Sequence, residues 1–160
     1  MKQKNFLHLL IATGFGSGYF PKAPGTAGAV LATLIWIGIS LITTPLCLFI
    51  VTALLIVLFT FLGVWSSGVM ETQWGKDPSK VVIDEMVGVW IPLLAVNNEN
   101  KYYLYYALAA LLLFRLFDIF KPLGIRKMEA INGGWGIMLD DILAGIYSLF
   151  ILYGLRCLIG

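Results

Sequence analysis

Two pairs of adjacent carboxylates stand at the edges of apolar segments in this sequence. Asp84 and Glu85 occur in VIDEMVG, Asp140 and Asp141 occur in MLDDILAG, and a glycine follows each pair about one helical turn later. Ionisable residues at a hydrocarbon boundary cost free energy and are candidates for function, while the glycines would let a neighbouring helix approach closely. We predict that both pairs lie at helix starts and form one site. The alternative is that the acids only cap two helices.

A row of charged side chains precedes the second pair. In FRLFDIFKP, Arg115, Asp118 and Lys121 recur in steps of three, which places them along one side of a helix. Pro122 then interrupts that helix. Phenylalanine, leucine and isoleucine surround the row, so it belongs to a mostly apolar helix. This favours a role in binding an anion over the alternative, a ladder of surface ion pairs.

The segment GFGSGYFPKAPGT, from Gly14 to Thr26, is rich in glycine and proline. Such backbone does not form a regular helix and can come close to a ligand. Together with Lys22 and the hydroxyl of Thr26, it suits an anion such as phosphate, although it matches neither a Walker A motif nor a dinucleotide fingerprint. His8 is the single histidine of the chain, and we interpret it as structural.

The residue types narrow the chemistry of the site. Carboxylates without a cluster of histidines or thiols favour Mg²⁺ or Mn²⁺ over zinc, because hard cations prefer oxygen ligands. Cys47 and Cys157 are far apart in apolar stretches, which fits neither a disulfide framework nor a zinc site. Mg²⁺ held by carboxylates, together with lysine and arginine, is the equipment of phosphoryl transfer. At a membrane surface the expected substrate is an anionic lipid phosphate.

The composition predicts an integral membrane protein. The chain of 160 residues is 59% hydrophobic and has a mean hydropathy of +0.88. Soluble domains have an apolar content of only roughly 45–50%. We therefore predict a single membrane-embedded domain, residues 1–160. The net charge of +2 is too small to indicate a nucleic-acid partner.

Five apolar runs separated by polar turns predict an all-α, polytopic helical bundle. About four to five helices would be embedded in the membrane, and a short N-terminal helix over Phe6–Ala12 would be interfacial or re-entrant. Residues 66–80 and 118–137 are expected to be polar connections. The third run is short, and whether it spans the membrane is left open. The five runs are Ala27–Ile42, Leu46–Trp65, Val81–Val96, Tyr102–Phe117 and Met138–Leu158.

The distribution of charge predicts the orientation in the membrane. With the N-terminus inside, five alternating helices place nine of the eleven lysines and arginines on the inner side, which is a clear positive-inside asymmetry. Eight of the nine acids fall on the same side, and Glu99 is the exception. Short outer loops explain the basic residues but not the acids at helix ends. We expect a multi-pass protein whose site faces the cytoplasm.

Four motifs make the chain resemble the phosphatidylglycerophosphatase A family of bacterial enzymes, which convert phosphatidylglycerophosphate into phosphatidylglycerol. They are HLLIATGFGSGYFPKAPGTAG at 8–28, DPSKVVIDEMVG at 77–88, FRLFDIFKP at 114–122 and GGWGIMLDDILAG at 133–145. The resemblance covers nearly the whole chain. It implies a Mg²⁺-dependent lipid phosphatase of the bacterial inner membrane that acts in phospholipid biosynthesis on phosphatidylglycerophosphate, with the oligomeric state left open.

The resemblance also implies roles for residues, by motif position. The expected metal ligands are Asp77, Asp84, Glu85, Asp140 and Asp141, and the expected catalytic acids are Asp84, Glu85, Asp118, Asp140 and Asp141. Lys22, Arg115 and Lys121 would bind the phosphate, and Glu129 is a weaker candidate acid. Thr26, whose hydroxyl belongs to the glycine-rich segment, is also expected to bind the substrate. The expected mechanism is direct hydrolysis with Asp118 or Asp141 as general base. A transient aspartyl-phosphate is the alternative.

A small ion-coupled transporter is the rival interpretation, because intramembrane acids also bind coupling ions. It predicts acids near the middle of the bilayer and broken helices in two corresponding halves. The acids of this chain instead cluster at one edge, which favours chemistry at the membrane surface. A non-catalytic subunit would leave the acid pairs without a purpose. Lipid phosphatases that use a phosphohistidine need more than the one histidine present.

Overall fold

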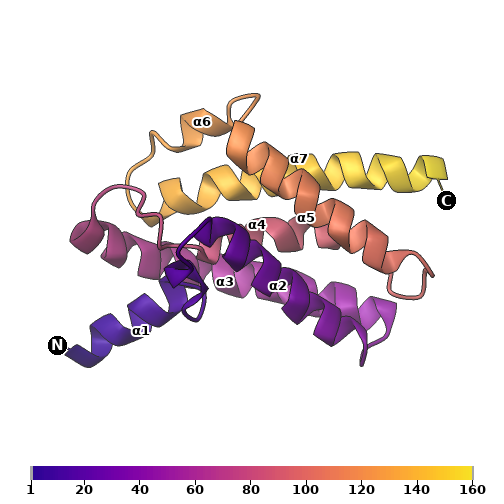
Figure 1. Ribbon diagram of the computed structural model, residues 1–160, viewed down its shortest axis with the longest axis horizontal. Helices are drawn as coiled ribbons and strands as arrows, with labels where there is room; N and C mark the ends of the chain where they lie inside the picture. Colours follow the sequence, from indigo (N-terminus) through magenta and orange to yellow (C-terminus); the bar gives the residue numbers. More distant parts are fainter. Residues whose placement is uncertain (1, 160) are drawn as a thin grey trace.

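The computed structural model describes the backbone of residues 2–159 and the side chains of residues 6–158. Over these residues the chain folds into seven α-helices and one 3₁₀ turn, with no strand (Figure 1). The predicted all-α class is therefore confirmed. The elements are α1 (Lys2–Ala12), η1 (Ser17–Tyr19), α2 (Pro24–Ser40), α3 (Pro45–Trp74), α4 (Ile83–Leu93), α5 (Tyr103–Phe120), α6 (Ile125–Met128) and α7 (Gly134–Ile159).

Three of the described helices, α3, α5 and α7, are long and apolar enough to cross a membrane, judged by length and composition. The apolar helix α2 is shorter, with 17 residues. Helix α4 has 11 residues, a length of about 16 Å, roughly half the thickness of the hydrocarbon layer. The third apolar run, Val81–Val96, therefore contains a short helix that does not span by itself.

Helix α4 is the central helix of the bundle. Ten of its eleven residues are buried, and it packs against α2, α3, α5 and α7. Trp90 Nε1 donates a hydrogen bond of 2.9 Å to the carbonyl of Ala32 in α2. The amide of Val82 donates to the carbonyl of Ala12, at 2.9 Å, and so ties the start of α4 to the end of α1. A helix covered on all sides is apolar all round, which explains why α4 has no polar face beyond the acids of its first turn.

The longer helices α2, α3, α5 and α7 run along the length of the bundle (Figure 1). At one end, Asn98 Nδ2 donates to the carbonyls of Ser40 and Thr43, at 2.7 and 2.8 Å, and so joins the α2–α3 turn to the α4–α5 turn. Near the same end, Arg156 of α7 donates to the carbonyl of Ala95 at 2.6 Å. The connections that precede α4 and α7 lie at the opposite end, with the acids. The turns therefore alternate between the two ends of the bundle, and the orientation of the bundle in a membrane stays a prediction.

Two helices are longer than predicted. Residues 66–74 were expected in a polar connection but continue α3 to Trp74. The prediction was wrong because polar residues alone do not end a helix; α3 ends at Gly75, which has a φ of 91°. Helix α5 likewise continues to Phe120 and ends where Lys121 adopts a φ of 46°.

The acid pair of α7 lies deeper in its helix than predicted. The helix begins at Gly134, and its first turn contains no acid, so Asp140 and Asp141 lie in the second turn. The acids of α4, by contrast, lie in its first turn, as predicted. The early start of α7 follows from packing: Gly133 turns the chain with a φ of 81°, and Gly134 lies against the backbone of Val64 in α3, where a Cβ would clash.

The residues interpreted as structural have structural surroundings. His8 is buried, and its ring centroid lies 4.1 Å from that of Trp65. Cys47 and Cys157 are free and exposed. None of the three residues lines the cavities that the acids line.

Two glycines let α4 and α7 approach closely. A Cβ added at Gly145 would meet the carbonyl oxygen of Gly88, and a Cβ added at Gly88 would lie 3.0 Å from the carbonyl oxygen of Asp141 and still closer to the ring of Phe114. Neither position has room for a side chain. The prediction that the glycine after each acid pair permits close approach is confirmed, and this approach brings the two acid-bearing turns together.

We expect Gly145→Ala to lower the free energy of unfolding by about 1–3 kcal/mol, because the added methyl group overpacks the crossing. Gly154→Ala is the matched control in the same helix, since nothing lies within 4 Å of its added Cβ. The control should be neutral or stabilising by up to about 1 kcal/mol, because glycine is a poor helix former. Thermal unfolding in detergent, followed by circular dichroism, compares the two; equal midpoints would contradict the role of the crossing.

Candidate active site

A cavity of about 250 Å³ opens at the end of the bundle that holds the acids, and we call it the acid cavity. Side chains from α4, α5 and α7 line it, together with the segments before α2 and α4. Eight of the ten predicted site residues line this one cavity although they are far apart in the sequence. They are Asp77, Asp84, Glu85, Arg115, Asp118, Lys121, Asp140 and Asp141.

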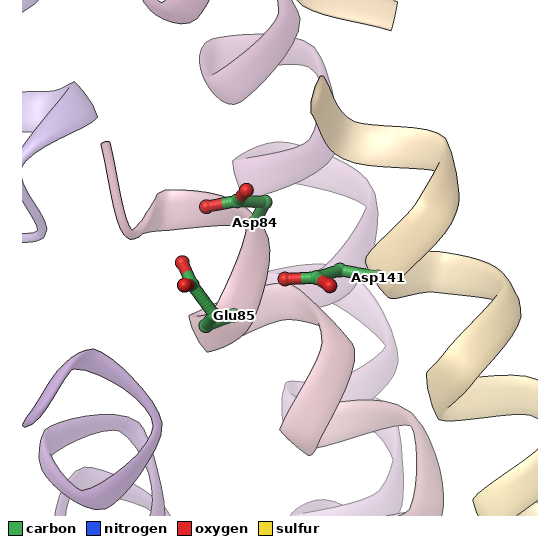
Figure 2. Close-up of side chains that lie close together, drawn as sticks. All are labelled: Asp84, Glu85 and Asp141. Carbon is green, nitrogen blue, oxygen red and sulfur yellow. The ribbon is translucent and has the colours of Figure 1, made fainter. Parts of the chain in front are cut away.

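Three carboxylates converge in this cavity. Asp84 and Glu85 of α4 and Asp141 of α7 point into one region between the two helices (Figure 2). One carboxylate oxygen of each residue lies within 4.8 Å of those of the other two. Asp84 and Asp141 are buried, with 7% and 2% of their surface exposed. Buried carboxylates this close repel one another unless protons or a cation neutralise them, and a hard divalent cation such as Mg²⁺ takes oxygen ligands of this kind.

Unpartnered buried oxygens also fit a bound cation. Asp84 Oδ1, Glu85 Oε2 and Asp140 Oδ1 are buried and have no hydrogen-bond partner among the described residues. Such an atom costs about 1–3 kcal/mol when it stays unsatisfied, and buried charges are normally paired or coordinate metals. The oxygen donors and their unsatisfied state together fit a group of residues that could bind a metal ion.

Arg115 and Asp118 line the acid cavity from α5. Nη1 of Arg115 forms an ion pair with Oδ2 of Asp118, and the two side chains are only 17% and 12% exposed. Nε of Arg115 is buried and has no partner in the described part of the chain. The ion pair therefore orients the guanidinium at the wall of the cavity and leaves Nε without a partner. Guanidinium groups bind phosphate oxygens through such donors.

Lys121 bridges two acids at the edge of the cavity. Its Nζ donates to Oδ2 of Asp140 at 2.6 Å and to Oε1 of Glu129 at 2.7 Å. Burial alone lowers the pKa of Lys121, but the hydrogen bonds to Asp140 and Glu129 outweigh this and raise the pKa above its usual range. Lys121 therefore stays protonated. Asp140, a predicted metal ligand, is held by this lysine and lies outside the group of three carboxylates that meet.

Asp77 lies at the mouth of the acid cavity. It is exposed and has a φ of 48°. Asp77 and Asp140 also line a second cavity of about 360 Å³, whose other charged residues are Glu71, Lys76 and Glu129. Asp77 is not among the three carboxylates that meet, so its role as a metal ligand stays a prediction.

Lys22 and Thr26 lie beside the acid cavity and do not line it. They belong to a separate groove of about 350 Å³, which we call the α2 groove. Ala23 lines both the groove and the cavity. The predicted contact of Lys22 and Thr26 with the same phosphate group as Arg115 therefore lacks support from the geometry.

Small residues that the sequence did not single out also shape the cavity. A Cβ at Gly25 would meet Oε1 of Glu85 and lie 3.1 Å from Nη1 of Arg115, so the missing side chain makes room for both. Ala23 and Ser79 line the same cavity. The available signal was the density of glycine and proline in KAPGT and DPS, which marks irregular backbone, but this signal does not say which residue faces a ligand.

Comparison with known proteins decides the family. A family model described as Phosphatidylglycerophosphatase A matches residues 10–156. The chain belongs to the phosphatidylglycerophosphatase A family. The resemblance seen in the four motifs is confirmed, and the chain is a phosphatase, so the interpretation as a transporter is not retained.

Relatives of this phosphatidylglycerophosphatase A family member match it over nearly its whole length. A protein of Bacteroides thetaiotaomicron named "Putative phosphatidylinositol-3-phosphatase" is 56% identical over 100% of both chains. Phosphatidylglycerophosphatase A of Haemophilus influenzae is 37% identical over 95% of this chain and 90% of its own. Phosphatidylglycerophosphatase A of Escherichia coli is 36% identical over 96% of this chain and 85% of its own. No solved structure matches the chain.

We expect Lys121→Met to lower the free energy of unfolding by about 1–3 kcal/mol, because it leaves the buried carboxylate of Asp140 without its cation. The pKa of Lys121 is raised in the folded state, so its contribution is fully present below the ordinary value of 10.5 and is lost only as the pH rises through the higher folded value.

The destabilisation by Lys121→Met should therefore be constant from neutral pH to about pH 9 and should shrink only in more alkaline solution. Unfolding midpoints measured across this range check the prediction. Lys127→Met is the control, because Lys127 is exposed on α6, and it should have little effect. A destabilisation that disappears already near neutral pH would contradict the assigned ion pair.

Proposed function

We propose that this chain is a Mg²⁺-dependent phosphatase that hydrolyses the terminal phosphomonoester of phosphatidylglycerophosphate to phosphatidylglycerol and phosphate. One observation carries the proposal: Asp84, Glu85 and Asp141 converge beside Arg115 in one cavity. Membership of the phosphatidylglycerophosphatase A family supports the substrate. The product makes the reaction a step of phospholipid biosynthesis.

Asp84, Glu85 and Asp141 would hold the metal, each through one oxygen. When bound, Mg²⁺ supplies charge neutralisation for the phosphate and activation of a water molecule. Asp140 would act mainly by positioning, because Lys121 holds one of its oxygens. This division assigns different roles to the two aspartates of α7.

Arg115 and Asp118 would carry out the steps that the chain itself performs. Arg115 would bind a phosphate oxygen through a guanidinium N–H that Asp118 does not occupy and would offset the negative charge that develops there. Asp118 is outside the three-carboxylate group and lines the same cavity, so we assign it the role of general base. It takes a proton from the attacking water as the new oxygen–phosphorus bond forms. It returns this proton to the leaving glycerol oxygen as the ester bond breaks.

The lipid would reach the cavity from the bilayer. The helices α3, α5 and α7 are long and apolar enough to span it, and the acid cavity lies at one end of the bundle. The diacylglycerol would stay in the hydrocarbon layer while only the headgroup enters the cavity. The excess of lysine and arginine on the side of the acids supports the cytoplasmic face of the inner membrane as its location.

A phosphatidylinositol phosphate is the second candidate substrate. The relative named for phosphatidylinositol-3-phosphatase activity is 56% identical to this chain, against 36–37% for the two phosphatidylglycerophosphatases. Both lipids carry a phosphomonoester on a polyol, and a phosphodiester joins that polyol to diacylglycerol. The same carboxylates and arginine would therefore serve either reaction.

Phosphate release from the two lipids by the purified protein tests these candidates. We expect release from phosphatidylglycerophosphate that stops with EDTA and returns with added Mg²⁺, because the carboxylates need the cation to bind phosphate. A higher kcat/KM for phosphatidylinositol 3-phosphate would move the assignment to the second candidate. Release from neither lipid, or release that ignores the chelator, would refute the proposal.

Variants of the acids test which of them hold the metal. Asp141→Asn should lower activity and raise the Mg²⁺ concentration for half-maximal activity by about 10- to 100-fold, because a ligand charge is lost. Asp140→Asn should lower turnover with a smaller change in the Mg²⁺ requirement. Glu99→Gln is the control, since Glu99 is exposed on the α4–α5 turn at the other end of the bundle. A Mg²⁺ requirement more sensitive to Asp140→Asn than to Asp141→Asn would reverse the assignment.

A further inference from the structure

We propose that Lys22 and the α2 groove bind the lipid beyond its terminal phosphate: Lys22 binds the phosphodiester and the groove binds one acyl chain. The inference rests on the proposed lipid phosphatase function and extends it. It identifies which part of the substrate is recognised besides the phosphomonoester, and it applies to both candidate lipids.

The lining of the α2 groove is almost entirely apolar. Phe20, Val30, Leu31 and Leu34 contribute to it, and Lys22 and Thr26 are its polar residues. Phe20 and Leu34 have 59% and 58% of their surface exposed. An exposed apolar groove on a membrane protein suits a hydrocarbon chain, and its volume of about 350 Å³ leaves room for several methylene groups.

The groove begins where the acid cavity ends. Ala23 lines both of them, and its backbone adopts a φ of 55° directly before Pro24 starts α2. A single molecule with a phosphate beside Arg115 and a hydrocarbon chain along α2 would therefore pass over Ala23. Lys22 directly precedes Ala23 in the chain.

Lys22 has the charge that such a molecule requires at this point. It is exposed and forms no ion pair with the described residues, whereas Arg115 and Lys121 are each paired with acids. In both candidate lipids a phosphodiester lies between the phosphomonoester and the acyl chains. A cation between the cavity and the groove therefore stands opposite this second phosphate, and the two charges are complementary.

This arrangement predicts selectivity against phosphatidic acid. Phosphatidic acid carries its phosphomonoester directly on diacylglycerol and has no phosphodiester for Lys22. Its phosphate also cannot enter the acid cavity without drawing the acyl chains toward the charged residues. We therefore infer that the enzyme prefers lipids with two phosphates.

A second apolar groove provides a comparison. It lies on α3, has a volume of about 500 Å³ and is lined by Leu54, Val57, Leu58, Phe61, Leu62 and Trp65. It shares no residue with the acid cavity. A lipid that merely surrounds the protein would contact either groove, but substrate would use the α2 groove alone.

Lys22→Met tests the contact with the phosphodiester. It should lower kcat/KM for phosphatidylglycerophosphate by about tenfold, mainly through KM, because it removes one hydrogen bond to a charged group. The kcat/KM for phosphatidic acid should fall less. The ratio of kcat/KM for phosphatidylglycerophosphate to kcat/KM for phosphatidic acid should therefore decrease. Lys127→Met is the matched control for a lost charge at the same end of the molecule. An unchanged ratio would overturn the role of Lys22.

Ala27→Phe tests the acyl chain, because Ala27 lines the α2 groove and a phenyl ring would fill it. With wild-type protein, kcat/KM should rise with the acyl chain length of the substrate. Ala27→Phe should lower the value for the long-chain lipid by about tenfold, equivalent to roughly two buried methylenes, and should flatten the dependence on length. Val57→Phe in the α3 groove is the control and should leave both kcat/KM and its dependence on acyl chain length unchanged.

The outcomes separate the two proposals. Equal effects of Ala27→Phe and Val57→Phe mean bulk lipid contact only and would overturn the role of the α2 groove, as would wild-type activity independent of chain length. Phosphate release by the wild type with unaltered selectivity in the variants refutes this inference and leaves the proposed function intact. No release by the wild type refutes the proposed function and this inference with it.

Discussion

The candidate site depends on the crossing of α4 and α7, where Gly145 packs against the backbone of Gly88. This contact between glycines brings Asp141 beside Asp84 although the two residues come from different helices. Burying such carboxylates together is unfavourable by itself. The surrounding packing has to hold them, and α4 is suited to this because ten of its eleven residues are buried against four other helices.

The charged residues around this crossing fall into two groups. Asp84, Glu85 and Asp141 have no basic partner within ion-pair distance among the described residues, whereas Asp118 and Asp140 are paired with Arg115 and Lys121. All five residues are carboxylates, but their pairing separates them. The three unpaired acids suit a cation, whereas Asp118 and Asp140 hold the side chains of Arg115 and Lys121 in place. In the proposed reaction, the unpaired acids hold Mg²⁺. Of the paired residues, Arg115 binds the phosphate and Asp118 transfers the proton.

The two ends of the bundle also differ in how their polar groups are paired. At the end away from the acids, Asn98 and Arg156 satisfy backbone carbonyls and so join turns and helices. At the acid end, buried atoms of Asp84, Glu85, Asp140 and Arg115 have no partner among the described residues, and at the other end Asn98 Oδ1 also has none. These unpartnered atoms at the acid end belong to ionisable groups, a pattern expected where a ligand completes the structure. The α2 groove continues from this end along the apolar surface. In the proposed binding mode, the phosphate of the lipid lies in the polar cavity and an acyl chain lies along the apolar surface of α2.

The sequence by itself determined the helical class, the family and most of the residues that line the acid cavity. Apolar runs and short motifs are local properties, and they are readable without distances. Only the tertiary structure decided that Asp141 joins Asp84 and Glu85 while Asp140 pairs with Lys121, because neighbours on a helix point in directions about 100° apart and a helix crossing selects one of them. It also separated Lys22 from the cavity that Ala23 lines. The start of α7 depended on the contact of Gly134 with the backbone of Val64 in α3, a contact between distant segments that the local sequence does not encode.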